Sequence, residues 1–193
     1  MAHDGQDIAM ANVVVLDDLL ALTDAAIAPA QGILDKAVAH MRELVVVDGR
    51  VSGAAVEANQ YAAHGLAWLA TYVEALRQMQ NWAKGLKENG KFGEVEQLIQ
   101  QIAFGEYLNQ IRGGIQMNQG EMIRLSDLGL TQADIAALDT PQVMTLVQSG
   151  NTQAARTRLV ELMQERSAEI TVGHSGLDDE LEMIREQFRR FSV

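Results

Sequence analysis

The chain has 193 residues, of which 48% are hydrophobic, and it contains no cysteine. Its formal net charge of −11 argues against nucleic acid or an anionic membrane surface as a partner, because both are bound through clustered Lys and Arg. The missing thiols exclude disulfides, thiolate metal sites and a cysteine nucleophile. No basic leader precedes an apolar run and no segment is suited to span a bilayer, so we expect a soluble, cytoplasmic protein.

The apolar periodicity predicts an all-α fold, an up-and-down helical bundle with additional short helices. Residues 1–12 are expected to be a disordered tail. A first helical region runs from about residue 13 to 47, and Pro29 and Gly32 either divide it into two helices or kink a single one.

A second, long helix is expected from about residue 53 to 88, with Ser52 as its cap and Asn89-Gly90 at its end. Before it, the stretch Val45–Val47 is compatible with a short strand followed by the turn Asp48-Gly49. Because the sequence offers no second strand, we favour the end of a helix and a turn there.

The long helix carries two apolar faces. One contains Leu66, Leu69, Val73 and Leu76, and the neighbouring one contains Tyr61, Trp68, Tyr72, Ala75, Met79 and Trp82. A surface this wide predicts a helix that is covered on two sides.

A third helix is expected from about residue 93 to 112, ended by Gly113-Gly114, and Gly105 within it would let another helix come close. Its apolar face contains Val95, Leu98, Ile99, Ile102, Leu108 and Ile111. A short helix is expected next at about 119–125, followed by a turn at 127–129. Two further helices should run from the cap Thr131 through Leu138 and from Thr140-Pro141 to Ser149-Gly150. The last helix of this region is capped by Asn151 or Thr152 and runs to about Ile170, and its apolar stripe contains Ala155, Leu159 and Leu162.

The last elements are a linker and an amphipathic helix. We expect residues 13–172 to form one helical accessory domain, 173–177 to be a linker, and 178–193 to begin a further helical domain. The final helix aligns Leu181, Ile184, Phe188 and Phe191 on one stripe, and acidic residues occupy its first turn. This stripe needs a surface to cover: either a following domain, of which this helix would be the truncated start, or the preceding bundle.

Few residues are arranged for chemistry. His40 and Glu43 lie three apart on a predicted helix and are compatible with a shared metal, but the repeated Glu-x-x-His order of di-iron bundles does not occur. A packed histidine is the favoured interpretation of His64, whereas an intact small helical enzyme would require Glu57, His64 and Glu106 to converge in one cleft. His3 and His174 are expected to be solvated, in a tail and a linker.

Other patterns in the sequence give less evidence for a functional site. The serines Ser52, Ser126, Ser149 and Ser167 lie in no nucleophile-elbow context, and no Gly-rich phosphate loop is present. Glu74 and Arg77 are compatible with a buried ion pair or a groove, and we favour an exposed edge. The aromatic face at Tyr61, Trp68, Tyr72 and Trp82 is compatible with a stacking site for a flat cofactor, and we favour ordinary packing.

Two stretches resemble a known family. The segment 179–191, Asp-Glu-Leu-Glu-Met-Ile-Arg-Glu-Gln-Phe-Arg-Arg-Phe, is similar to the opening helix of the acyl-CoA dehydrogenase fold. Tyr61–Arg77 and Glu94–Leu130, with Ala103-Phe104-Gly105-Glu106-Tyr107-Leu108, resemble the extra N-terminal region of the methylsuccinyl-CoA dehydrogenase group within that family.

The resemblance implies a parent enzyme that uses FAD to remove two hydrogens from a short branched acyl-CoA, and a chain that serves packing or oligomerisation. Its implied partners are the catalytic acyl-CoA dehydrogenase domain of the same protein and further copies in a homo-oligomer. The family's flavin and catalytic motifs follow the opening helix, so no catalytic, cofactor-binding or metal residue is assigned here, and the chain alone is expected to be inactive. The alternative is a free-standing acidic helical module that recruits a basic partner.

Overall fold

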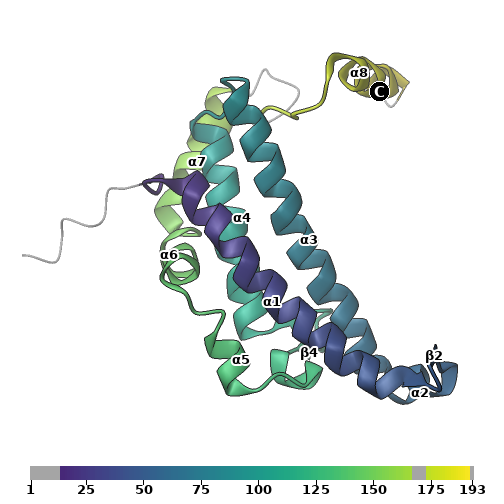
Figure 1. The fold of residues 1–193 in the computed structure, drawn as a ribbon. Coiled ribbons are helices and arrows are strands. Elements are labelled where there is room, and N and C mark those ends of the chain that lie inside the picture. Colours follow the sequence, from purple (N-terminus) through teal and green to yellow (C-terminus); the bar gives the residue numbers. More distant parts are fainter. Residues whose placement is uncertain (1–13, 167–172, 192–193) are drawn as a thin grey trace, which may run out of the picture.

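A computed structural model describes residues 14–166 and 173–191 (Figure 1). It confirms the all-α bundle, to which two small β-hairpins are added. Three long helices lie side by side and alternate in direction: α1 (Leu19–Val45), α3 (Gln60–Glu88) and α4 (Glu94–Gly113). Helices α6 (Pro141–Ser149) and α7 (Gln153–Glu165) pack against α4. The predicted tail of residues 1–12, with His3, lies outside the described residues.

Helix α1 is continuous, so of the two alternatives a single helix is correct and a division into two helices is not. Pro29 lies inside it and cannot donate a backbone hydrogen bond to the carbonyl of Ala25. Because Ala25 is on the exposed side of the helix, water can satisfy that carbonyl. The proline is therefore tolerated without ending the helix.

The first hairpin corrects the turn expected after residue 45. Strand β1 (Val46–Val47) pairs antiparallel with β2 (Arg50–Val51). Asp48 and Gly49 between them have φ angles of 50° and 75°. Two positive φ angles in a two-residue loop match the twist of a hairpin, and Asp-Gly is a preferred sequence for such a loop.

The predicted long second helix is broken once, near its start. Ser52 caps α2 (Gly53–Ala58) by accepting a hydrogen bond from the amide of Ala55 at 3.3 Å. Asn59 ends α2, since its side-chain Nδ2 donates to the carbonyl of Ala55 at 2.8 Å, and α3 follows directly. The predicted end holds: α3 stops at Glu88, and Gly90 follows with a φ of 65°.

A second hairpin replaces the short helix expected at 119–125. Strand β3 (Ile115–Gln116) pairs antiparallel with β4 (Met122–Ile123), which places Ile115 opposite Ile123. Both isoleucines are buried, and a Cβ added to Gly65 on α3 would lie 2.3 Å from Cγ1 of Ile123. Burial of this cross-strand pair against α3 stabilises the hairpin over a local helix.

Threonine caps start the later helices as predicted. Thr131 caps α5 (Gln132–Ala136), Thr140 caps α6 and Thr152 caps α7. A 3-10 helix, η1 (Leu125–Leu128), lies where a turn was expected. Helix α5 ends before Leu138, and α7 ends at Glu165, ahead of the predicted Ile170, which itself lies outside the described residues.

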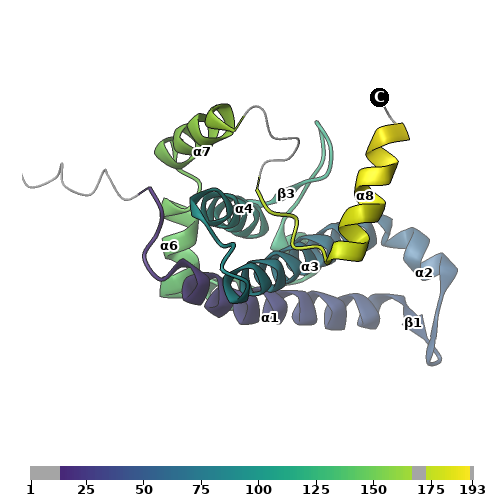
Figure 2. The same cartoon turned by 90° about the horizontal axis from the view of Figure 1, so that it is seen from above.

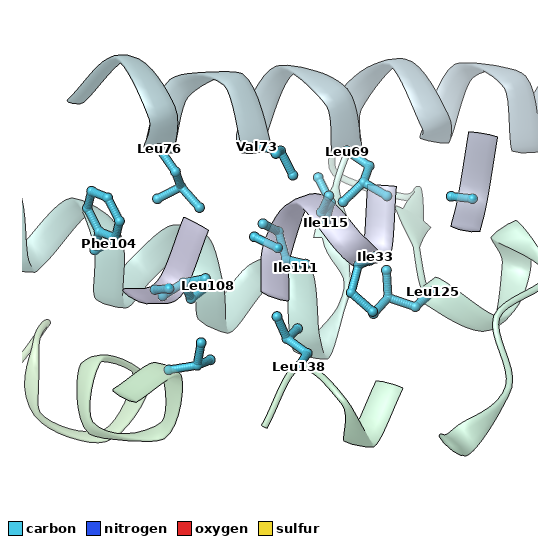
Figure 3. Close-up of a cluster of buried hydrophobic side chains, with 14 of the residues drawn as sticks. Ile33, Leu69, Val73, Leu76, Phe104, Leu108, Ile111, Ile115, Leu125 and Leu138 are labelled. Carbon is cyan, nitrogen blue, oxygen red and sulfur yellow. The ribbon is translucent and has the colours of Figure 1, made fainter. Parts of the chain in front are cut away.

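The main core lies between α1, α3, α4 and α6 (Figure 3). The predicted face of α3 points into it, with Leu69 and Leu76 fully buried and Val73 2% exposed. Phe104 and Leu108 of α4 are also fully buried. A smaller apolar cluster joins α4 to α7 and contains Val95, Leu98, Ala155 and Leu162.

Helices α4 and α6 approach each other closely at two glycines, as predicted for Gly105. A Cβ added to Gly105 would lie 2.8 Å from both the amide nitrogen of Asn151 and the carbonyl oxygen of Leu146. One added to Gly150 would lie 2.6 Å from the carbonyl oxygen of Gln101. Both positions are therefore restricted to glycine by the backbone of the facing element.

Candidate interaction surface

Helix α8 (Asp179–Phe191) is built by local sequence signals. Asp178 precedes it, and its Oδ1 accepts a hydrogen bond from the amide of Leu181 at 2.8 Å. Asp179 and Glu180 lie in the first turn, and Arg189 and Arg190 lie in the last. The cap and both charge signs, which complement the helix dipole, favour a helix at this position from local sequence.

The apolar stripe of α8 is exposed. We call it the α8 ridge, and it consists of Leu181, Ile184, Phe188 and Phe191. Phe188 is 73% exposed and Phe191 is 88% exposed, and none of the described residues of α8 is buried. Figures 1 and 2 show α8 projecting away from the other helices. The ridge therefore does not pack back on the bundle in this structure.

The second apolar face of α3 is half-covered. Trp68, Tyr72, Ala75, Met79 and Trp82 are all partly buried, and Tyr61 is 45% exposed. On the other predicted face Leu69, Val73 and Leu76 are buried and Leu66 is partly buried, so the bundle covers that face more fully than the aromatic one.

Aromatic rings on this face contact one another. Trp68 and Tyr72 meet edge-on with centroids 6.3 Å apart, and Tyr72 and Tyr107 of α4 lie 4.6 Å apart. The hydroxyl of Tyr72 donates to Gln110 at 2.6 Å, and partial burial, with Tyr107 and Glu106 nearby, raises the pKa of this tyrosine. The contacts of Trp68, Tyr72 and Tyr107 are those of α3–α4 packing, which is the interpretation favoured from the sequence.

His40 and Glu43 are not joined by a third possible metal ligand in the part of the chain that the structure describes. The imidazole of His40 lies over Gly129, where an added Cβ would come within 2.1 Å of its Cδ2. Within residues 14–166 and 173–191, no three His, Asp or Glu side chains are grouped so that they could hold a metal ion. His40 thus acts as a packing residue between α1 and the loop after η1.

The three residues required by a small helical enzyme have different surroundings. Glu57 is exposed on α2. His64 accepts a hydrogen bond from Nε1 of Trp68 at 3.0 Å, but its side chain is exposed, so the expectation of a packed histidine is wrong in that respect. Glu106 accepts from Gln110 and from Asn151 at the start of α7. No hydrogen bond or ion pair among the described residues joins them, so the structure does not support this hypothesis.

The exposed edge expected for Glu74 and Arg77 is confirmed. Arg77 and Glu74 form an exposed ion pair, with side chains 50% and 51% exposed. Ser52 serves as a helix cap, Ser126 lies in η1 and Ser149 ends α6, while Ser167 is outside the described residues.

Comparison with known proteins agrees with the resemblance inferred from the sequence. The chain matches part of an acyl-CoA dehydrogenase. It is 52% identical over 178 residues to (2S)-methylsuccinyl-CoA dehydrogenase of Cereibacter sphaeroides. The matched stretch covers 92% of this chain and 32% of that enzyme. No protein-family model matches the chain.

The match to this acyl-CoA dehydrogenase covers most of this chain, but the chain spans only about a third of the relative's length. The greater part of the relative therefore has no counterpart in these 193 residues. Among the described helices, none combines the length and apolarity needed to cross a membrane. The α8 ridge and the partly covered aromatic face of α3 are thus the surfaces of this chain that are candidates for contact with other polypeptide.

Sequence reasoning missed two residues at the base of α8. Glu96 of α4 and Trp82 of α3 bind the backbone of His174, in the segment that was expected to be a linker. A glutamate three residues after the helix-start Gly93 is a recognisable capping signal, but nothing local indicates its bond to residue 174.

Proposed function

We propose that this chain is the non-catalytic N-terminal helical region of an FAD-dependent acyl-CoA dehydrogenase, and that the α8 ridge packs on the catalytic part of the same enzyme. The observation that carries the proposal is the exposure of Phe188 and Phe191 on an otherwise well-formed amphipathic helix. Contiguous exposed apolar side chains typically mark a site of protein contact.

The length of the relative supports this choice of partner. An acyl-CoA dehydrogenase that is 52% identical to the chain is about three times as long as the matched stretch. We propose that the part of such an enzyme beyond the matched stretch is the surface on which the α8 ridge packs. The proposed substrate is accordingly a short branched acyl-CoA such as methylsuccinyl-CoA, and the proposed role of this region is packing or support of a homo-oligomer.

FAD in the proposed enzyme belongs to the catalytic part. The resemblance places the family's flavin and catalytic motifs after the opening helix, so we assign no residue of this chain to the flavin, the acyl-CoA or the abstraction of a proton.

Burial of the α8 ridge would contribute a substantial hydrophobic free energy. The two phenylalanines together expose roughly 300 Å2, since a Phe side chain presents about 150–250 Å2. At about 25 cal/mol/Å2, their burial contributes on the order of 8 kcal/mol before the costs of ordering and desolvation.

The test compares hydrogen exchange of α8 in two proteins. One is this chain, and the other is a polypeptide in which this chain precedes the remaining part of the Cereibacter sphaeroides enzyme, with bound FAD as the check that the catalytic part is folded. We expect the amides of α8 to exchange at least 10-fold more slowly in the longer protein. Equal exchange in both would overturn the proposal.

A variant pair sharpens the test. In the longer protein, Phe188→Ser with Phe191→Ser should restore fast exchange in α8. The matched control, Val160→Ser with Met163→Ser, removes two exposed apolar side chains of α7 and should leave α8 protected, because these residues are 51% and 40% exposed and lie away from the ridge. Loss of protection in both variants alike would remove the assignment to the ridge.

A further inference from the structure

The segment that leads into α8 begins at a buried carboxylate. Glu96, in the first turn of α4, is 1% exposed. Its Oε2 accepts a hydrogen bond from the amide of Gly93 at 3.1 Å, and its Oε1 accepts one from the amide of His174 at 2.9 Å. A buried carboxylate is costly unless it is hydrogen-bonded, so the bond to His174 is part of what makes Glu96 stable in this position.

The other backbone group of His174 is bound by a different helix. Nε1 of Trp82, on α3, donates to the carbonyl oxygen of His174 at 3.0 Å. The two polar groups of this one residue are therefore held by side chains from the two helices that meet at this end of the bundle. Its own imidazole is not needed for either bond, and His174 is exposed, as predicted.

Two glycines let the segment lie close to these helices. Gly173 has a φ of 77°, and a Cβ added to it would be 3.2 Å from Oε1 of Glu96. Gly176 has a φ of 75°, and a Cβ there would be 2.9 Å from Cδ1 of Trp82. The glycines that predict a flexible linker thus serve a close contact with the bundle.

Further hydrogen bonds continue from this segment into α8. The hydroxyl of Ser175 donates to Glu182 at 3.0 Å and accepts from the amide of Leu177 at 3.2 Å. Asp178 then caps the helix. Hydrogen bonds therefore run from the anchors on α3 and α4 to the first turn of α8.

We infer that residues 173–178 form a rigid joint, anchored by Glu96 and Trp82, that fixes the direction of α8 relative to the bundle. The inference that the joint thereby sets the angle at which the catalytic part is held rests on the proposed function. The joint itself is a property of this chain and is tested without any partner.

The experiment is a distance measurement between two spin labels. The chain has no cysteine, so Ala67→Cys on α3 and Gln187→Cys on α8 give two unique attachment sites, both at exposed positions. We expect a single narrow distance distribution for this doubly labelled protein. A broad distribution would overturn the inference, because a free linker lets α8 sample many directions.

Two matched pairs of variants identify the anchors. Trp82→Phe keeps an aromatic ring but loses the donor to His174, and Trp68→Phe loses an equivalent donor to His64 as its control. Glu96→Gln replaces one of two acceptor oxygens by a donor, so that it cannot bind both amides, and Glu94→Gln is its control on the same helix.

We expect Trp82→Phe and Glu96→Gln each to widen the distribution at least twofold, and the two controls to leave it unchanged. Equal widths in all four variants would refute the assignment of the anchors. Since Trp82→Phe does not touch the start of α4, it decides the outcome even if Glu96→Gln loosens that helix. Failure of α8 to dock on a catalytic part would leave this result unaffected, so the two proposals fail separately.

Discussion

Replacing Gly105 by alanine tests the closest helix contact in the bundle. The new methyl group would lie 2.8 Å from the amide nitrogen of Asn151 and 2.8 Å from the carbonyl oxygen of Leu146. Both are backbone atoms, so no side chain can rotate away to make room. Helices α4 and α6 must separate, or α4 must shift along the core around Phe104.

The expected loss follows from two opposing effects. Overpacking of a core contact typically costs about 1–3 kcal/mol, and contact with backbone on two sides places this site at the upper end or beyond. Alanine in a helix gains about 1 kcal/mol over glycine. We therefore expect a net loss of about 2 kcal/mol in the free energy of unfolding, or roughly 4–8 °C in Tm for a chain of this size.

The assay is urea unfolding followed by circular dichroism, with Gly32→Ala as the control. Gly32 lies inside α1, and a Cβ there meets nothing within 4 Å. The control should therefore show only the higher helix propensity of alanine, which raises the free energy of unfolding by up to about 1 kcal/mol. If Gly105→Ala is as stable as the parent chain or stabilises it like Gly32→Ala, the close α4–α6 approach described here is wrong.

The remaining stability predictions concern the core and one ion pair. Phe104→Ala should lower the free energy of unfolding by about 3–5 kcal/mol, because its ring is fully buried. Trp68→Ala should lower it clearly less, because the ring of Trp68 is only partly buried. Equal losses for the two variants in urea titrations would contradict the burial of the two rings. The ammonium of Lys36, with the capping contact to Thr131, holds the pKa of Asp134 well below its ordinary value of 3.8. A pKa lowered in the folded state means that the unfolded chain binds more protons, so this stabilisation is complete above the ordinary value and is lost as the pH falls through and below it. Asp134→Asn should therefore reduce the dependence of Tm on pH below about pH 4, and an unchanged acid slope would show that the pair is not formed in solution.

The starts of the later helices were predictable because a cap signalled each of them. Thr131, Thr140 and Thr152 each precede a helix and accept a hydrogen bond from the amide three residues later, which depends only on local sequence. The buried face of α3 was equally predictable, because apolar residues at helical spacing are a local pattern.

The second hairpin and the joint depend on distant contacts. The β3–β4 pair is held by Ile123 against Gly65, and these residues are far apart in sequence, so the local propensity of 119–125 gave the wrong element. The first hairpin carried a usable signal in Asp48-Gly49, but its strands have only two residues each. Glu96 and Trp82 lie 78 and 92 residues from His174, and no pattern within the linker indicates them.

The most direct measurement of the central claim is a structure of this chain together with the catalytic part of the acyl-CoA dehydrogenase, determined by electron cryo-microscopy. Phe188 and Phe191 are 73% and 88% exposed in the chain by itself. The account predicts that both rings lie in the interface with the catalytic part, each less than about one-tenth exposed, as is usual for a residue at an interface centre. A structure in which both rings remain in solvent, with α8 free of the catalytic part, would contradict it.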